Sequence, residues 1–273
     1  MTIPRILIIA GSDSGGGAGI QADIKTVTML GGHAMTAVTA ITAQNTLGVQ
    51  AVHPIPADMV VAQIDSVASD IGVDAVKIGM LGSPEVAHAV ADRLSVMRKV
   101  PLVFDPVMVA TSGAVLADDA TVAAFDRLIR MATLSTPNLP ELAALGGETR
   151  WTGAAGAVLI KGGHASGDEV EDRLIWPGGD RRWVKRRIAT VHTHGTGCTL
   201  ASAIATGLGA GLDLERATDR AIAFVRSAIS AAPGLGGGNG PLGHTIGRTP
   251  YYDCLAADLR NGSDAATFVA RWR

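Results

Sequence analysis

Cysteine is scarce in this 273-residue chain, which contains two, Cys198 and Cys254. Two cysteines make no disulfide framework, and such scarcity fits a reducing compartment. Long apolar runs are also missing, because Gly, Asp, Lys or His interrupts each one before it reaches membrane-spanning length. The N-terminal residues lack the apolar region and cleavage site of a signal peptide. We therefore expect a soluble, cytoplasmic protein that does not enter a membrane.

Charge imbalance is small as well, with a net charge of −2. This balance gives no electrostatic reason for the chain to capture nucleic acid or an anionic membrane. The exception is a basic cluster at residues 181–187 (RRWVKRR), which alternates in a way typical of a solvated edge strand. With 47% hydrophobic and 18% charged residues, the composition is that of an ordinary globular protein.

Short apolar runs alternate with helical patterns along most of the chain. Strands are predicted at 6–10, 34–43, 49–55, 74–79, 102–104, 134–136 and 157–161. Helices are predicted at 20–30, 57–70, 84–98, 118–131, 198–210 and 214–232, and an antiparallel pair at 169–175 and 182–188. This alternation predicts one α/β domain, a doubly wound, mostly parallel sheet with helices on both faces.

Polar or flexible residues stand where the predicted parallel strands end. In such sheets ligands bind beyond the carboxyl ends of the strands. The residues at these ends are Gly11, Gln44, Met80, Asp105, Asn138 and Lys161. Their shared position predicts a binding site at one edge of the sheet. An amide such as that of Gln44 can offer a donor and an acceptor side by side to a heterocycle, although it can equally cap a strand.

The glycine-rich loop at residues 11–19 matches neither of two common nucleotide-binding motifs. A P-loop would end in Gly-Lys-Ser/Thr, whereas Gly16 is followed by Gly17 and Ala18. A dinucleotide-binding fingerprint would begin in the first turn after the strand and have an acidic residue about 20 positions on, and neither condition is met. The loop is instead expected to close around a small ligand, with Asp13 as its one acid.

A second glycine-containing turn, at residues 194–200 (HGTGCTL), leads into a predicted helix. Glycines at a helix start leave backbone N–H groups unshielded, and these donors with the helix dipole form an anion site. Cys198 would then lie in the first turn, where the pKa of a thiol tends to fall. The alternative is a tight turn with a small buried cysteine, and the local sequence favours neither.

Together these groups fit phosphoryl transfer, which needs a phosphate cradle and a neutralising cation. Asp105, Asn138 and Glu141 could form a water-rich Mg²⁺ site, Lys161 could bind phosphate, and the turn could supply N–H groups. Each also has a structural alternative. Asp105 and Asn138 adjoin prolines as turn residues do, and Glu141 could simply complement a helix start.

Several segments resemble one enzyme family, the hydroxymethylpyrimidine/phosphomethylpyrimidine kinases of thiamine biosynthesis. The resemblance covers roughly residues 5–244 in order and is carried by residues 11–23 (GSDSGGGAGIQAD), 42–49 (TAQNTLGV), 76–82 (VKIGMLG), 105–109 (DPVMV), 136–141 (TPNLPE), 161–164 (KGGH) and 194–199 (HGTGCT). It implies a ribokinase-like three-layer α/β/α sandwich over residues 1–244, a C-terminal extension at 245–273, and a homodimer.

The resemblance also implies an activity, the ATP- and Mg²⁺-dependent phosphorylation of 4-amino-5-hydroxymethyl-2-methylpyrimidine and then of its monophosphate. In this comparison Gln44 matches the residue that reads the pyrimidine edge, and the pocket around it is matched by Gly11, Asp13, Met80 and Val107. The phosphate and metal region is matched by Asn138, Glu141 and Lys161, and the anion hole by Gly195, Thr196, Gly197 and Cys198.

Two departures from the family pattern qualify these expectations. Cys198 stands where most ribokinase relatives have an aspartate base, so we expect the backbone N–H groups of the turn to contribute more than the thiol. Thr111 replaces a family lysine, which puts one phosphate contact, and with it the second phosphorylation, in question. Two other functions stay open: a pyridoxal kinase of the same fold, and a non-catalytic pyrimidine-binding protein.

Overall fold

The computed structural model describes residues 2–97, 99–110, 113–151 and 156–246. Thr111 and nearly all of the 245–273 extension lie outside the described residues. The expectations for both therefore stay predictions. Within the described ranges no helix is long and apolar enough to cross a membrane.

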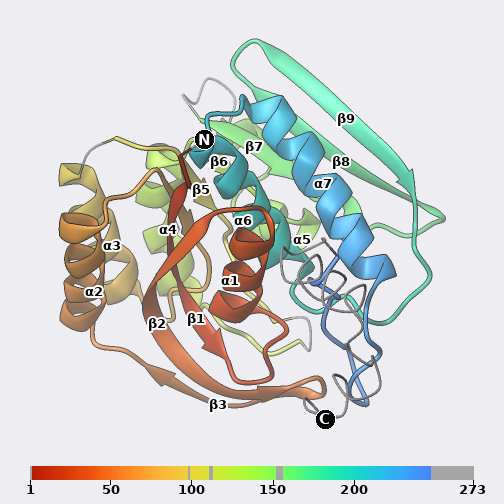
Figure 1. The fold of residues 1–273 in the computed structure, drawn as a ribbon, viewed down its shortest axis with the longest axis horizontal. Coiled ribbons are helices and arrows are strands. Elements are labelled where there is room, and N and C mark those ends of the chain that lie inside the picture. The colour runs from red at the N-terminus through yellow and green to blue at the C-terminus, as the bar shows by residue number, and fades with distance from the viewer. Residues whose placement is uncertain (1, 98, 111–112, 152–155, 247–273) are drawn as a thin grey trace, which may run out of the picture.

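A nine-stranded sheet forms the centre of the molecule, in the order β3-β2-β1-β4-β5-β6-β7-β8-β9 (Figure 1). The strands from β2 to β7 in this order pair in parallel, whereas β3, β8 and β9 pair antiparallel at the two edges. The strands are β1 (Arg5–Asp13), β2 (His33–Asn45), β3 (Gly48–Pro54), β4 (Ala75–Ile78), β5 (Leu102–Phe104), β6 (Leu134–Ser135), β7 (Ala157–Ile160), β8 (Glu169–Trp176) and β9 (Gly179–Arg186).

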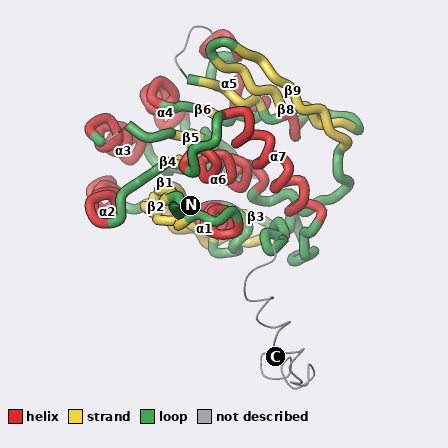
Figure 2. Tube along the Cα trace, turned by 45° about the horizontal axis from the view of Figure 1, so that its top comes forward, coloured by secondary structure: helices red, strands yellow, loops and turns green. Residues whose placement is uncertain are grey.

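Helices cover both faces of the sheet and make three layers (Figure 2). On one face, apolar side chains of α2, α3 and α4 pack with β1, β4 and β5 in one core cluster, and those of α1, α6 and α7 form a second cluster on the other face. The helices are α1 (Gly19–Met29), α2 (Ala57–Asp70), α3 (Pro84–Val96), α4 (Asp119–Met131), α5 (Leu139–Ala144), α6 (Thr196–Gly209) and α7 (Leu214–Ser230).

The predicted α/β architecture is confirmed, and most predicted elements match to within a few residues. The basic cluster lies on β9 at the sheet edge, as its alternation indicated. Its exposed arginines pair with carboxylates of neighbouring elements: Arg181 with Asp219 and Arg182 with Glu171. The sequence pattern did not reveal α5, because this helix is too short to show a helical period.

Candidate active site

One cavity of about 810 Å³ opens at the carboxyl ends of the parallel strands. All the residues predicted for the site line it, although they come from segments spread over most of the chain. They are Gly11, Asp13, Gln44, Met80, Asp105, Val107, Asn138, Glu141, Lys161, Gly195, Thr196, Gly197 and Cys198. The structure thus brings together every group that the strand-end pattern placed at this edge.

Asp13 organises the glycine-rich loop between β1 and α1. Its carboxylate accepts hydrogen bonds from the backbone N–H groups of Gly15, Gly17 and Ala18 at 2.8–3.0 Å. Burial alone would raise the pKa of Asp13, but hydrogen bonds from His194 and from these N–H groups lower it below its usual value. Asp13 is therefore ionised at neutral pH and holds the loop over the cavity.

Gln44 lies beside this loop, near the end of β2. The backbone N–H of Gln44 donates to Ser14 Oγ at 2.8 Å, and Ser14 Oγ in turn reaches the carbonyl oxygen of Gln44. On the far wall, a Cβ added at Gly11 would lie 3.1 Å from Met80 Sδ. A flat ring would therefore meet a close backbone approach on that side and the amide of Gln44 at its edge.

At the other end of the cavity, Lys161 lies between two carboxylates. Its Nζ donates to Asp105 Oδ1 at 2.6 Å and lies 3.8 Å from Glu141 Oε2. Burial alone would lower the pKa of Lys161, but the charges of Asp105 and Glu141 raise it. Lys161 is therefore a cation at neutral pH and is suited to contact a phosphate.

Asn138 and Glu141 stabilise the start of helix α5, which was the structural alternative considered for Glu141. They form a capping box at the start of α5, in which Asn138 Oδ1 accepts from the Glu141 N–H and Glu141 Oε2 accepts from the Asn138 N–H, both at 2.8 Å. Both residues also line the cavity. The cap fixes the orientation of the Glu141 carboxylate, so the two roles are compatible.

The turn before α6 places backbone donors beside Lys161. Gly195 is the N-cap of α6 in the left-handed conformation, with φ of 85°. The Thr196 N–H and Oγ1 both bond to the carbonyl of Thr193, so they are already engaged. A Cβ on Gly197 would lie 3.2 Å from Lys161 Nζ. The N–H groups of Gly197 and Cys198, in the first helical turn, are therefore the donors best placed for an anion.

The expected lowering of the Cys198 pKa is wrong. Burial raises the pKa of this thiol to about 11, and the nearby Asp23 and Asp105 carboxylates add to the rise, although Lys77 and a hydrogen bond from the Gly19 N–H oppose it. The helix end does not compensate for the loss of solvation. Cys198 is thus a neutral thiol at pH 7.

Sequence reasoning gave no role to Lys77 and His194, which line the cavity, nor to Asp23, which lies behind Lys77. Lys77, within apolar β4, is fully buried and donates to Asp23 Oδ2 of α1 at 2.8 Å. Ser202 of α6 donates to the other oxygen of Asp23 at 2.7 Å. His194 contacts Asp13. A lysine inside an apolar strand was the available signal, because a buried charge requires a partner.

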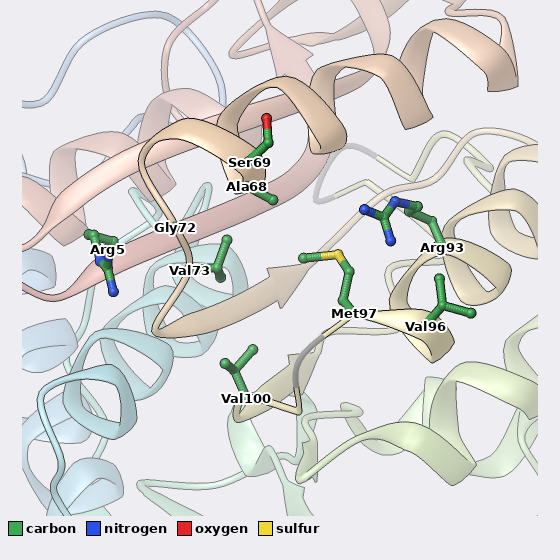
Figure 3. Close-up of a pocket in the computed structure, with 9 residues that line it drawn as sticks. All are labelled: Arg5, Ala68, Ser69, Gly72, Val73, Arg93, Val96, Met97 and Val100. Atoms are coloured by element: carbon green, nitrogen blue, oxygen red, sulfur yellow. The ribbon is translucent and has the colours of Figure 1, made fainter.

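A smaller hollow, of about 450 Å³, lies at the opposite end of the sheet, near the ends of α2 and α3 (Figure 3). Its two lining arginines, Arg5 and Arg93, are paired with Asp74 and Asp65. The predicted site residues all line the larger cavity instead.

The larger cavity fits a Mg²⁺ ion only if the substrate phosphates supply part of its coordination. Among the described residues, no cluster of three or more His, Cys, Asp or Glu side chains could hold a metal. Asp105 and Glu141 nevertheless both line the phosphate end of the cavity, on either side of Lys161. Mg²⁺ commonly uses one or two carboxylates together with waters and substrate phosphates. The donor set therefore fits an ion that arrives with a nucleotide.

Comparison with known proteins agrees with this geometry. The family model described as phosphomethylpyrimidine kinase matches residues 13–243. A hydroxymethylpyrimidine/phosphomethylpyrimidine kinase of Streptomyces coelicolor is 48% identical over 259 residues, covering 89% of this chain and 95% of the relative.

Solved structures show the same fold. Bacillus subtilis pyridoxal kinase in complex with ADP superposes with a TM-score of 0.80 at 32% identity, over 89% of this chain and 98% of the other. Phosphomethylpyrimidine kinase of Clostridium difficile superposes with a TM-score of 0.71 at 36% identity, over 84% of this chain and 100% of the other. The chain belongs to the phosphomethylpyrimidine kinase family, with its ribokinase-like fold.

Proposed function

We propose that this chain transfers the terminal phosphoryl group of ATP to the hydroxymethyl oxygen of 4-amino-5-hydroxymethyl-2-methylpyrimidine, and then a second group to the resulting monophosphate. One observation carries the proposal: the same cavity is lined by Gln44 and Met80, which suit a heterocycle, and by Lys161 and the Gly195 turn, which suit a phosphate. A kinase needs these two ends within reach of each other.

The nucleotide would enter from the side of β8, β9 and α7. There the cavity is lined by apolar side chains and by cations, among them Val170, Ile222 and Val225 and, nearby, Arg187 and Arg226. Apolar walls suit a purine base, and the cations suit its phosphates. The terminal phosphate would then reach Lys161.

In the transfer, the substrate oxygen bonds to the terminal phosphorus as the bond to the ADP oxygen breaks. Negative charge on the transferring oxygens would be stabilised by Lys161 and by the N–H groups of Gly197 and Cys198. Bound Mg²⁺, held by Asp105 and Glu141 with the phosphates, would neutralise further charge. The hydroxyl proton leaves late and passes to an oxygen of the transferred phosphoryl group or to water, since a loose transition state demands little of a base.

Cys198→Ala is expected to keep kcat within about tenfold of the wild-type value, because general-base groups typically contribute 10²–10⁴-fold and this thiol is protonated at pH 7. Cys198→Ser is the matched variant, since it keeps a small polar group. Steady-state kcat at pH 7 and pH 9 measures the effect. Two results together would show that Cys198 is the general base. They are a hundredfold lower kcat in the alanine variant and a wild-type kcat that rises roughly tenfold per pH unit.

Product analysis by mass tests the function directly. With the pyrimidine and excess MgATP, a diphosphate product is expected. A monophosphate alone would restrict the activity to the first step and direct attention to Thr111. Pyrimidine binding without any phosphorylated product would make the chain a binding protein. The cation and backbone donors at the Lys161 end of the cavity do not favour that role.

Pyridoxal is the second candidate substrate, favoured by the structural similarity to Staphylococcus aureus pyridoxal kinase in complex with pyridoxal, with a TM-score of 0.80. The same assay with pyridoxal in place of the pyrimidine separates the two. A higher kcat/KM for the pyrimidine is expected, because the amide of Gln44 can pair with both the ring nitrogen and the amino group of an aminopyrimidine.

A further inference from the structure

Three polar side chains from distant parts of the chain meet at the substrate end of the cavity. His194 Nε2, in the turn before α6, lies 2.9 Å from Asp13 Oδ2 and 3.3 Å from Gln44 Nε2. On its other side, Gln44 Oε1 lies 3.1 Å from Thr42 Oγ1. The amide of Gln44 is thus held between His194 and Thr42.

The charge of Asp13 decides which nitrogen of His194 has a proton. Asp13 already accepts backbone N–H groups and is ionised. A carboxylate faces an imidazole nitrogen at 2.9 Å favourably only if that nitrogen donates a proton. We therefore place a proton on His194 Nε2, which donates it to Asp13 Oδ2.

A protonated Nε2 then decides how the Gln44 amide lies. With Gln44 Nε2 facing it at 3.3 Å, two donors would confront each other. Thr42 Oγ1 lies 2.9 Å from the carbonyl oxygen of Ser12, to which it donates, so it presents a lone pair to Gln44. Half a turn of the amide satisfies both neighbours, because Oε1 then accepts from His194 and Nε2 donates to Thr42.

We propose that His194, held by Asp13, is a positioning residue that fixes the Gln44 amide with Oε1 toward the Gly195 turn. This rests on the proposed function for its consequence. The edge of the amide that faces the cavity keeps one free lone pair on Oε1 and one free hydrogen on Nε2. An aminopyrimidine pairs with this edge in one direction, its 4-amino group on Oε1 and its ring nitrogen N3 on Nε2.

The direction of pairing determines where the reacting group lies. In the substrate, the hydroxymethyl carbon is attached next to the 4-amino carbon, on the side away from N3. With Oε1 on the His194 side, the amino group and the hydroxymethyl group both lie toward the Gly195 turn. With the opposite amide orientation the ring would be reversed, and the hydroxyl would point toward Thr42, away from the phosphate end.

Close packing keeps the imidazole in place. A Cβ on Gly17 would lie 2.4 Å from His194 Cδ2, and one on Gly195 would lie 1.9 Å from the Gly17 carbonyl oxygen. The glycine-rich loop and the turn therefore touch directly at His194. The ring is oriented before substrate binds, which is the condition for a positioning role.

Two variants and two pyrimidines test the proposal. His194→Met removes the donor, whereas His194→Gln can still present an N–H group near the same place. The second pyrimidine is the 4-oxo analogue, whose N3–H and carbonyl pair with the amide in the reverse direction. The measured quantities are kcat and KM for each pyrimidine and KM for ATP, with melting temperature as the folding check.

Wild-type protein is expected to prefer the 4-amino compound by roughly 10⁴ in kcat/KM, as sites built around hydrogen bonds do. His194→Met should reduce kcat/KM for the 4-amino compound roughly 10–100-fold, leave KM for ATP unchanged, and shrink the preference by a similar factor. His194→Gln should recover most of the kcat/KM for the 4-amino compound and most of the preference for it. Unchanged preference in His194→Met, or an equal loss on both pyrimidines, would overturn the proposal.

A spectroscopic measurement keeps the test independent of activity. In protein labelled with ¹⁵N-histidine, the His194 signals, identified by their absence from the His194→Gln spectrum, should show a protonated Nε2. An unprotonated Nε2 would overturn the proposal even if both pyrimidines react as expected. If the wild type phosphorylates neither pyrimidine, the proposed function fails, while these signals still test the protonated Nε2 from which the amide orientation is inferred.

Discussion

Replacing Gly195 with alanine is expected to reduce kcat by roughly 10²–10³-fold, the cost of misplacing a preorganised backbone donor. The new Cβ would lie 1.9 Å from the Gly17 carbonyl oxygen, and φ at this position is 85°. A collision with backbone leaves no flexible atom to move, so the turn must shift and carry the N–H groups of Gly197 and Cys198 with it. Steady-state kinetics with MgATP and the pyrimidine measures the loss.

Gly211→Ala is the matched control for this prediction. Gly211 has nearly the same φ, 86°, but a Cβ there would meet nothing within 4 Å. Both variants face the backbone cost of a left-handed residue, about 1 kcal/mol or somewhat more. We expect Gly211→Ala to lower the melting temperature and leave kcat near the wild-type value. Equal kcat values for the two variants would contradict the role assigned to the turn.

Lys77→Met is expected to destabilise the fold by about 3–5 kcal/mol, the usual cost of leaving one member of a buried ion pair alone. Lys77 and Asp23 are both fully buried, at 0% side-chain exposure. Burial by itself would lower the pKa of Lys77, but the Asp23 carboxylate raises it. Burial also raises the pKa of Asp23, a shift that Lys77 and Ser202 oppose. The 2.8 Å contact between the two groups is that of an ion pair. Urea denaturation followed by circular dichroism gives the free energy of unfolding.

The double variant Lys77→Met with Asp23→Leu separates charge from packing. With both charges removed, most of the lost stability should return, because no uncompensated ion stays buried. If the double variant is as unstable as Lys77→Met alone, packing around Lys77 explains the loss and the ion pair does not. Exposed pairs such as Arg182–Glu171 should cost less than about 1 kcal/mol when broken, which gives a baseline.

The sequence predicted the fold well because its signals are local. The alternation of short apolar runs with helical patterns depends on neighbouring residues, and so do caps such as Ser83, which accepts from the Val86 N–H at the start of α3. α5 was missed for the same reason, since a helix of six residues has too few positions to show a period.

For the site, the strand-end pattern was sufficient to gather its members but not to describe their contacts. Parallel pairing places the carboxyl ends of the strands at one edge of the sheet, whichever side chains they have. Gln44, Asp105 and Lys161 therefore had to lie at the same edge. Their partners depend on packing between elements far apart in the chain. The sequence showed Lys77 in an apolar strand, but only the assembled layers show that Asp23 neutralises it.

The residues by themselves thus determined the order of the elements, the parallel sheet, and the edge at which chemistry could occur, because period, turn and strand-end signals act over a few residues. Only the tertiary structure decided the charges at that edge. Burial raised the pKa of Cys198, ion pairing kept Lys161 a cation, and hydrogen bonds lowered the pKa of Asp13. Solvation and electrostatic fields depend on what surrounds a group in space, which its sequence neighbours do not specify.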